Sequence, residues 1–173
     1  MRFLSKDPSF FEPLQSLRYP QDRDEACEAL ISYQHGYCAY SERYLMPLDS
    51  VEVEHFDPQL KNTSSDNIQN WHAVIRWMNS HKARKVENFR PLPDLARWDP
   101  ERVRFEDGEF VCDENDTEAD NLIRFLGVNK PEVFDHRAKH VARIKKILQL
   151  VGWDTPSSPF FKSLQKKPLF LVR

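Results

Sequence analysis

Five residues in the first half of the chain have the types and the order that a phosphodiesterase site requires: Glu54, His55, Asn70, Asn79 and Lys82. Hydrolysis of a phosphodiester needs a nucleophilic water, a base that takes its proton, and positive charge near the phosphoryl oxygens. An imidazole, whose pKa is ordinarily near ~6.5, can take that proton at neutral pH, so we predict His55 as the catalytic base. Carboxylate and amide oxygens suit hard divalent cations, so we predict Glu54 and Asn79 as metal ligands and Mg²⁺ or Mn²⁺ as the cofactor.

Asn70 and Lys82 are predicted to complete the catalytic set. Asn70 is expected to hold the His55 imidazole through its side-chain amide, which would fix the tautomer of the ring. Lys82 lies one helical turn after Asn79 in the predicted helix and is expected to contact phosphate. Taken singly, an asparagine is more often a turn residue and a lysine a solvated charge. The conjunction of all five residues is what points to catalysis.

The adjacency of Glu54 and His55 sets a condition on the local structure. Residues 51–55 alternate between valine and polar residues, which predicts a strand with one buried face. Adjacent strand residues point to opposite faces, so Glu54 and His55 reach one phosphate only where the strand ends or bends. Pro58 favours an ending, because proline cannot donate to a sheet ladder.

A net charge of −2 argues against nucleic-acid binding unless the charges are segregated along the chain. Between residues 76 and 104 basic residues outnumber acidic ones, and this stretch begins at the predicted metal site. We predict Lys82, Arg84, Lys85 and Arg90 as nucleic-acid contacts. Residues 105–120 contain acidic residues with no basic counterpart. This acidic stretch is interpreted as a solvated face, with mimicry of nucleic acid or docking on a basic partner as the alternative.

These residues lie in a longer stretch, about 24–90, that resembles HNH nucleases. The similarity is carried by Cys38–Glu42, by the Glu-His-Phe run at 54–56 with its following proline, and by Asn79–Lys82. Within that family the chain is most similar to the small PtuB-type HNH proteins of Septu and retron-associated anti-phage systems. The resemblance implies an α+β, mostly helical fold in which flanking helices surround a ββα-metal (HNH) core.

The resemblance also implies a function and partners. The chain would be a metal-dependent endonuclease acting on DNA or tRNA and a toxic effector held inactive until infection. Its expected partner is a PtuA-like SMC/ABC ATPase, joined in retron systems by a reverse transcriptase and its RNA/DNA product. The whole chain, 1–173, is predicted to be a single HNH domain, with the ββα core at about 37–88 and a C-terminal helical part and docking tail at about 117–173.

The chain departs from the family pattern at the structural zinc site. Four thiolates close such a tetrahedral site, but here Cys38 remains while the partner positions are Ser41, Ile75 and Met78. We therefore predict that this zinc is lost and that apolar packing replaces it. The candidate fillers are Ile75, Met78, Tyr37, Tyr40, Trp71 and Trp77. Two alternatives stay open: a catalytically weakened HNH scaffold that binds nucleic acid or protein, and an unrelated helical interaction protein with a chance motif.

Local patterns predict the other elements. Helices are expected at about 22–36, 78–86, 117–127 and 131–150, and short strands at 51–55 and 71–75. The Asp-Gly pair at 107–108 predicts a hairpin over 102–111. The basic face of the last helix, Arg137 to Lys146, and the aromatic tail, Phe160 to Phe170, are predicted docking surfaces.

Composition sets the remaining expectations. A chain of 173 residues with 30% charged and 40% hydrophobic residues is ordinary for one globular domain. It has no apolar run long enough to span a membrane and no signal-peptide pattern, so we expect a cytoplasmic protein without membrane contact. The odd number and wide spacing of Cys27, Cys38 and Cys112 predict reduced thiols.

Overall fold

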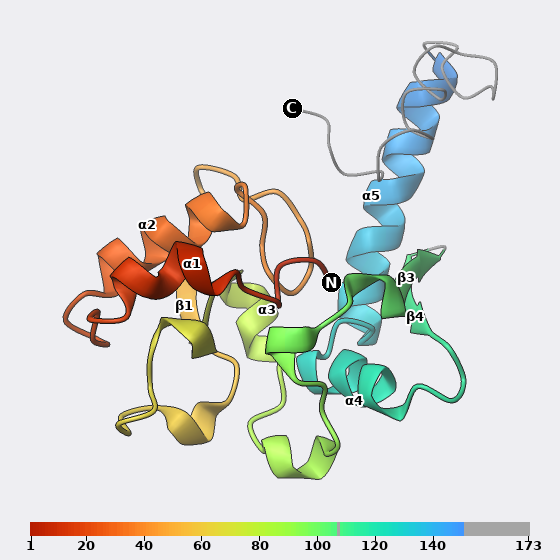
Figure 1. Ribbon diagram of the computed structural model, residues 1–173. Coiled ribbons are helices and arrows are strands. Elements are labelled where there is room, and N and C mark those ends of the chain that lie inside the picture. Colours follow the sequence, from red (N-terminus) through yellow and green to blue (C-terminus); the bar gives the residue numbers. More distant parts are fainter. Residues whose placement is uncertain (107, 151–173) are drawn as a thin grey trace.

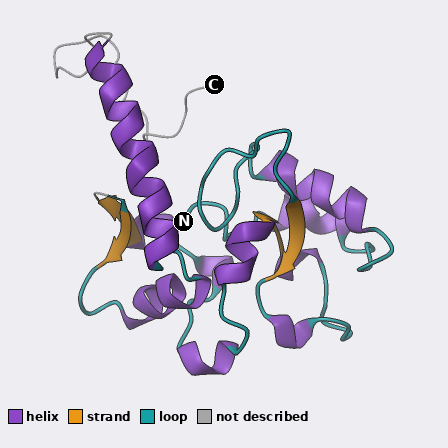
Figure 2. Ribbon diagram, turned by 180° about the vertical axis from the view of Figure 1, so that it is seen from behind, coloured by secondary structure: helices purple, strands orange, loops and turns teal. Residues whose placement is uncertain are grey.

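The computed structural model describes residues 1–106 and 108–150, and the described chain is α+β with more helix than strand. Figures 1 and 2 show the arrangement of its elements. The helices are α1 Pro8–Phe11, α2 Arg23–Tyr33, α3 Arg76–His81, α4 Thr117–Leu126 and α5 Pro131–Leu150. The strands are β1 Val51–His55, β2 Trp71–Ile75, β3 Val103–Glu106 and β4 Glu109–Cys112, and short 3-10 turns join many of the elements.

The unit that positions the predicted site is β1, β2 and α3. The two strands are antiparallel, with Val51 opposite Ile75 and His55 opposite Trp71. All five residues of β2 are buried, whereas β1 buries Val53 and His55 and leaves Val51, Glu52 and Glu54 partly exposed. The sequence prediction of both strands is therefore confirmed. Helix α3 begins at Arg76, directly after β2, so any side chain on α3 stays close to β1.

Two hydrophobic clusters lie on either side of this hairpin. The first packs α2 against the strands and includes Leu30, Val53 and Trp71. The second joins α3 and α4 to the opposite side and includes Val74, Met78 and other large apolar residues. Figure 1 shows α1 and α2 on one side of the hairpin and α3 and α4 on the other. Burial on both sides makes the end of β1 a fixed point in the molecule.

Helix α3 is shorter than the sequence predicts. It ends at His81, and Lys82 has an extended backbone with φ −62° and ψ 140°. Lys130 Nζ donates to the His81 carbonyl at 2.7 Å, and Gly127 packs directly against the same carbonyl. These contacts give the His81 carbonyl a partner from outside the helix. A further helical turn is therefore not needed to supply one. The prediction that Lys82 lies on the helix is therefore wrong.

Three of the four residues at the positions of the zinc ligands lie inside the second cluster, and the fourth, Ser41, is half-buried. Cys38 and Met78 are 0% exposed and Ile75 is 6% exposed, and Tyr40 is buried with them. Ile75, Met78 and Tyr40 therefore fill the positions of the zinc ligands, as the sequence predicts. The other candidate fillers do not: Trp77 is 41% exposed, Trp71 lies in the first cluster, and Tyr37 is half-buried and stacks on Phe3.

The C-terminal part of the described chain consists of the β3–β4 hairpin, α4 and α5. The predicted hairpin, the end of α4 at Gly127 and the start of α5 at Pro131 are all confirmed. The N-cap of α4 is Asp116, whose side chain accepts from the backbone N–H of Ala119 at 3.1 Å. Figures 1 and 2 show α5 rising from the body beside the β3–β4 hairpin.

Arg137 does not belong to a free basic face. Its guanidinium donates to the Gly108 carbonyl at 3.0 Å and to Asn129 Oδ1 at 3.1 Å, and it lies 4.7 Å from the centre of the Phe110 ring. Burial lowers its pKa to about 10. Arg137 therefore joins α5 to the hairpin. The predicted tail, Phe160 to Phe170, lies outside the described residues, as does the rest of 151–173.

No helix in the described ranges 1–106 and 108–150 combines the length and the apolar character needed to cross a membrane.

Candidate functional site

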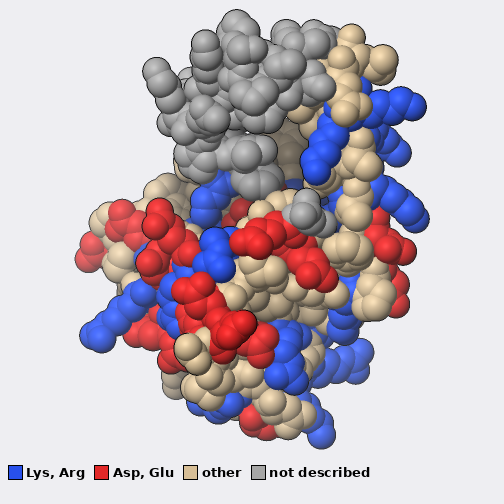
Figure 3. Space-filling model, turned by 90° about the vertical axis from the view of Figure 1, so that its right-hand side faces the viewer, with Lys and Arg blue, Asp and Glu red and all other residues tan. Residues whose placement is uncertain are grey.

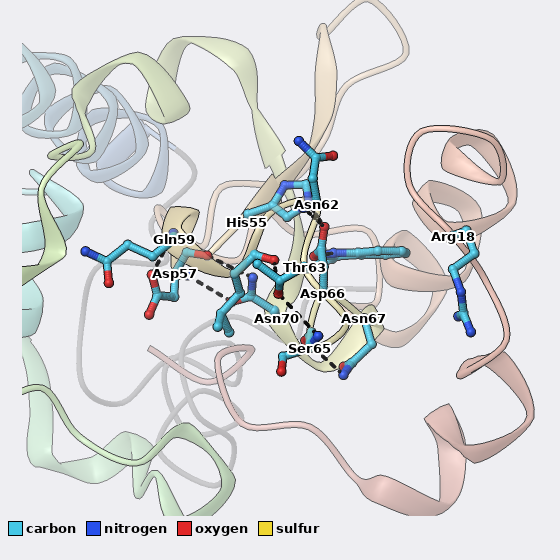
Figure 4. Close-up of polar contacts among 12 residues, drawn as sticks. Arg18, His55, Asp57, Gln59, Asn62, Thr63, Ser65, Asp66, Asn67 and Asn70 are labelled. Atoms are coloured by element: carbon cyan, nitrogen blue, oxygen red, sulfur yellow. Dashed lines mark hydrogen bonds and ion pairs between the residues drawn. The ribbon is translucent and has the colours of Figure 1, made fainter.

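The strongest polar constellation among the predicted residues is centred on His55, the last residue of β1. Its Nε2 lies 3.1 Å from Oδ2 of Asp66. Asp66 is itself fixed, because Oδ1 accepts from Trp71 Nε1 at 2.6 Å and Oδ2 accepts from the Asn62 backbone at 3.0 Å. Figure 4 shows Asp66 and Asn62 beside the imidazole. A carboxylate held in this way keeps the proton of a neutral imidazole on Nε2, which leaves Nδ1 as the basic nitrogen.

The surroundings of His55 favour its neutral form. Its side chain is buried, with 4% exposure, and the Tyr19 ring packs edge-on against it at 4.8 Å between centroids. Burial lowers the pKa of His55 below its ordinary value, and the nearby Lys61 charge adds to this, while Asp66 opposes it. Lys61 Nζ also lies 5.0 Å from the centre of the Tyr19 ring. An uncharged imidazole near neutral pH is the form a general base requires.

A surface depression of about 560 Å³ opens beside this pair. It is lined by Arg18, Tyr19, Gln21, Asp22, Asn62, Thr63 and Asp66. The depression therefore reaches Asp66 and the Tyr19 ring that covers His55. Arg18 and Asp22 are connected across it, since Asp22 Oδ2 accepts from the Arg18 backbone at 2.8 Å.

Asn70 does not contact His55 as predicted. Its Oδ1 accepts from the Asp57 backbone N–H at 2.8 Å and its Nδ2 donates to the Asp57 carbonyl at 3.0 Å. Asn70 lies just before β2, so these bonds tie the start of β2 to the turn that follows β1 (Figure 4). The amide is fully engaged by one backbone unit, and the role predicted for Asn70 at the imidazole belongs to Asp66.

Glu54 and Lys82 meet on the other face of β1. Lys82 Nζ forms an ion pair with Glu54 Oε1 and also donates to the carbonyls of His55 at 2.5 Å and Phe56 at 3.0 Å. The Lys82 side chain is 4% exposed and that of Glu54 is 15% exposed. Burial lowers the pKa of Lys82, while the Glu54 charge opposes this shift. Lys82 is thus an internal residue, and the prediction that it faces phosphate does not fit its position.

Asn79 contacts a carboxylate that the sequence prediction did not include. Its Nδ2 donates to Glu52 Oε2 at 2.9 Å, and the exposed Arg76 pairs with Glu52 Oε1 at 3.1 Å. Glu52 and Glu54 share a face of β1 because they are two positions apart. Asn79 on α3 therefore bonds to Glu52 of β1, not to Glu54, with which it was predicted to share a metal ion.

The chemistry of the donors on this face suits a hard divalent cation, but their arrangement does not. Glu52, Glu54 and Asn79 supply carboxylate and amide oxygens, the ligands that Mg²⁺ and Mn²⁺ prefer. In the structure Glu54 is bonded to Lys82 and Asn79 to Glu52. Within residues 1–106 and 108–150 no group of three or more His, Cys, Asp or Glu residues is placed to share a metal. A divalent ion at Glu54 would meet the Lys82 ammonium, which already bonds to Oε1.

The basic residues of the stretch 76–104 include two groups. Arg84, Lys85 and Arg90 are exposed and follow α3, so they remain available at the surface. Further along, arginines of the same stretch are neutralised by the acidic segment: Arg102 pairs with Asp116 and Glu118, and Arg104 with Glu106 and Asp113. Figure 3 shows basic and acidic side chains intermixed on this side of the body. The acidic stretch is therefore partly an internal partner of the basic one.

Sequence reasoning missed three residues of the site. Glu52 could have been found, because the alternation that predicts the strand places it on the face of Glu54. Asp66 and Tyr19 gave no such signal, since both come from loops that only the fold brings to His55.

Comparison with protein-family models, with curated proteins and with solved structures gives no match for this chain. Its function must therefore be argued from its own residues.

Proposed function

We propose that this chain is an endonuclease of the HNH type that hydrolyses phosphodiester bonds in DNA or tRNA. The observation that carries the proposal is the His55–Asp66 pair at the end of β1, with Nε2 and Oδ2 3.1 Å apart. The order of elements supports it as well: β1, β2 and α3 follow one another in the way the resemblance implies, and Asn79 on α3 bonds to the Glu52 carboxylate of β1.

In this proposal His55 takes a proton from water through Nδ1. The water oxygen forms a bond to phosphorus, the bond from phosphorus to the leaving oxygen breaks, and that oxygen takes a proton, so water is added across the phosphodiester. Asp66 holds the imidazole and stabilises its positive form, as a carboxylate does for a catalytic histidine elsewhere. A bound Mg²⁺ or Mn²⁺, the expected cofactor, would supply positive charge to the phosphoryl oxygens.

The described conformation is closed to a polynucleotide. His55 is 4% exposed and lies under Tyr19, and Glu54 is neutralised by Lys82. We therefore interpret it as a resting state that opens when metal and nucleic acid bind, and that a partner stabilises further in an effector held inactive until infection. An SMC/ABC-like ATPase of the PtuA type, with a reverse transcriptase and its RNA/DNA product in a retron system, is the proposed controlling partner.

A second candidate function is favoured by the same ion pair. If Glu54 stays bonded to Lys82 and Asn79 to Glu52 under all conditions, the chain is a catalytically silent HNH scaffold that binds nucleic acid or protein. Arg84, Lys85 and Arg90 would then be the main contact with phosphate.

A cleavage assay with purified protein separates the two candidates. Plasmid DNA and tRNA are incubated with the wild type, His55→Ala and the matched control His140→Ala, whose histidine is exposed on α5, with Mg²⁺ or Mn²⁺. The nuclease proposal expects cleavage by the wild type and the control, and a loss of roughly 10²–10⁴-fold in His55→Ala, as for removal of a general base. Binding of nucleic acid without cleavage by any of the three proteins would support the scaffold instead.

A further inference from the structure

Lys82 is bonded in the way that a metal ion would be. Its ammonium contacts one carboxylate oxygen, of Glu54, and two main-chain carbonyls, of His55 and Phe56. An ammonium has three donors, so all of its capacity is used inside the protein. Hard cations such as Mg²⁺ and Mn²⁺ take the same kinds of ligand, carboxylate and carbonyl oxygens. The end of β1 thus already contains a cation, supplied by the chain itself.

The position of Lys82 is built into the fold. The residue caps the end of α3 with an extended backbone, which turns its side chain from the helix towards β1. Lys130 and Gly127 fix the preceding carbonyl, that of His81. The Phe125 ring lies 5.3 Å from the ammonium and closes the remaining side. A buried lysine with one carboxylate and two carbonyl partners has no N–H donor left and does not face solvent. It therefore cannot bind a phosphate in this position.

We propose that Lys82 and a divalent cation compete for Glu54, and that the Glu54–Lys82 ion pair is the resting form of the site. The role of this ion pair as a resting form rests on the proposed function. The competition itself does not, because metal binding can be measured without cleavage. Withdrawal of the ammonium would leave the Glu54 carboxylate and the two carbonyls, which together form a set of hard oxygen ligands. They would surround a space of the size of the lysine head group. A metal then enters only when Lys82 leaves.

The alternative roles of Lys82 make different predictions. If Lys82 only joins β1 to α3, its removal weakens folding and creates no metal site. If Lys82 binds phosphate, its removal weakens nucleic-acid binding and leaves metal affinity unchanged. Competition alone predicts that loss of the lysine increases the affinity for a divalent metal, and that this gain depends on Glu54.

The test is a titration with Mn²⁺, followed by electron paramagnetic resonance of the free ion. The proteins are the wild type, Lys82→Met, Lys82→Met combined with Glu54→Gln, and the control Lys85→Met, which removes an exposed positive charge from the same segment. We expect Lys82→Met to bind one Mn²⁺ at least 10-fold more tightly than the wild type and Lys85→Met. The double variant should lose this gain.

Any of three comparisons between variants would overturn the proposal: equal Mn²⁺ affinity of Lys82→Met and the wild type, a gain that persists in the double variant, or an equal gain in Lys85→Met. If Lys82→Met does not fold, Lys82→Gln, which keeps a polar group for the carbonyls, is titrated in its place. The wild type also provides a test by itself, since tight Mn²⁺ binding that is lost in Glu54→Gln would show that Lys82 does not block the site. Because no arm measures cleavage, a chain without nuclease activity can still confirm the competition.

Discussion

Met78→Ala is the most quantitative test of the packing that fills the zinc-ligand positions. The Met78 side chain is 0% exposed and lies in the same cluster as Cys38 and Ile75. Truncation removes its buried methylene, sulfur and methyl groups and leaves a cavity, for which the usual cost is about 2–5 kcal/mol. Full burial places the expected loss in the free energy of unfolding near the middle of this range, about 3 kcal/mol. For a domain of this size about 2–4 °C is lost per kcal/mol, so the melting temperature should fall by about 6–12 °C.

The matched control is Met46→Ala, because Met46 is 54% exposed and its truncation should change stability by no more than about 0.5 kcal/mol. Urea unfolding of both variants, with and without EDTA, gives the two free energies. EDTA should change neither of them. The reasoning is refuted if Met78→Ala costs no more than Met46→Ala, or if the purified protein binds stoichiometric zinc that is lost in Cys38→Ser, since the cluster would then be held by metal.

Three further predictions concern protonation, backbone geometry and surface charge. Burial holds the pKa of His72 well below its ordinary value, and the neighbouring Lys6 charge adds to this. Below pH ~6.5 the unfolded chain therefore binds more protons than the folded chain, and the free energy of unfolding falls as the pH drops. Urea titrations at a series of pH values should show a weaker pH dependence of this free energy in His72→Gln than in the exposed control His140→Gln. Gly127→Ala should cost at least about 1 kcal/mol in urea unfolding, because φ there is +64° and the new Cβ would meet the His81 carbonyl, and a cost below this would show that the turn is not constrained. Reversal of the exposed charges at Arg84, Lys85 and Arg90 should weaken DNA binding and reduce the salt dependence of log Kd by about 0.9 per lost phosphate contact, whereas an unchanged salt dependence would remove this segment from the interface.

The strands and the C-terminal helices could be predicted because their signals are local. Alternating valines in β1, the Asp-Gly turn before β4, Gly127 after α4 and Pro131 at the start of α5 each determine structure within a few residues. The end of α3 had no such signal. The helix ends at His81 because Gly127 and Lys130, far along the chain, contact the carbonyl of that residue.

The sequence predicted the elements that carry His55 and Asn79 but not the contacts that these residues make. His55 ends β1 and Asn79 lies on α3, as the sequence predicted, but Asn79 bonds to Glu52, which the prediction did not include. Which carboxylate orients His55, and which cation neutralises Glu54, depend on tertiary contacts. Asp66 reaches the imidazole only because Trp71 and Asn62 hold it there, and no spacing rule contains that information.

The pH dependence of cleavage by the wild type and Asp66→Asn tests most directly the claim that chemistry takes place at the His55–Asp66 pair. Asparagine removes the negative charge, and in either orientation its NH₂ group opposes an N–H donor that now bonds to Asp66, that of Trp71 or of the Asn62 backbone, so the imidazole loses both its fixed partner and the charge that stabilises its protonated form. We expect single-turnover cleavage to fall by at least roughly 10–100-fold, the loss typical of a residue that orients a catalytic or metal-bound histidine. The negative charge of Asp66 raises the pKa of His55, and the variant lacks this charge. The pH at which residual activity falls on acidification should therefore be lower in the variant than in the wild type. A variant that cleaves at the wild-type rate with an unchanged pH profile would contradict the account.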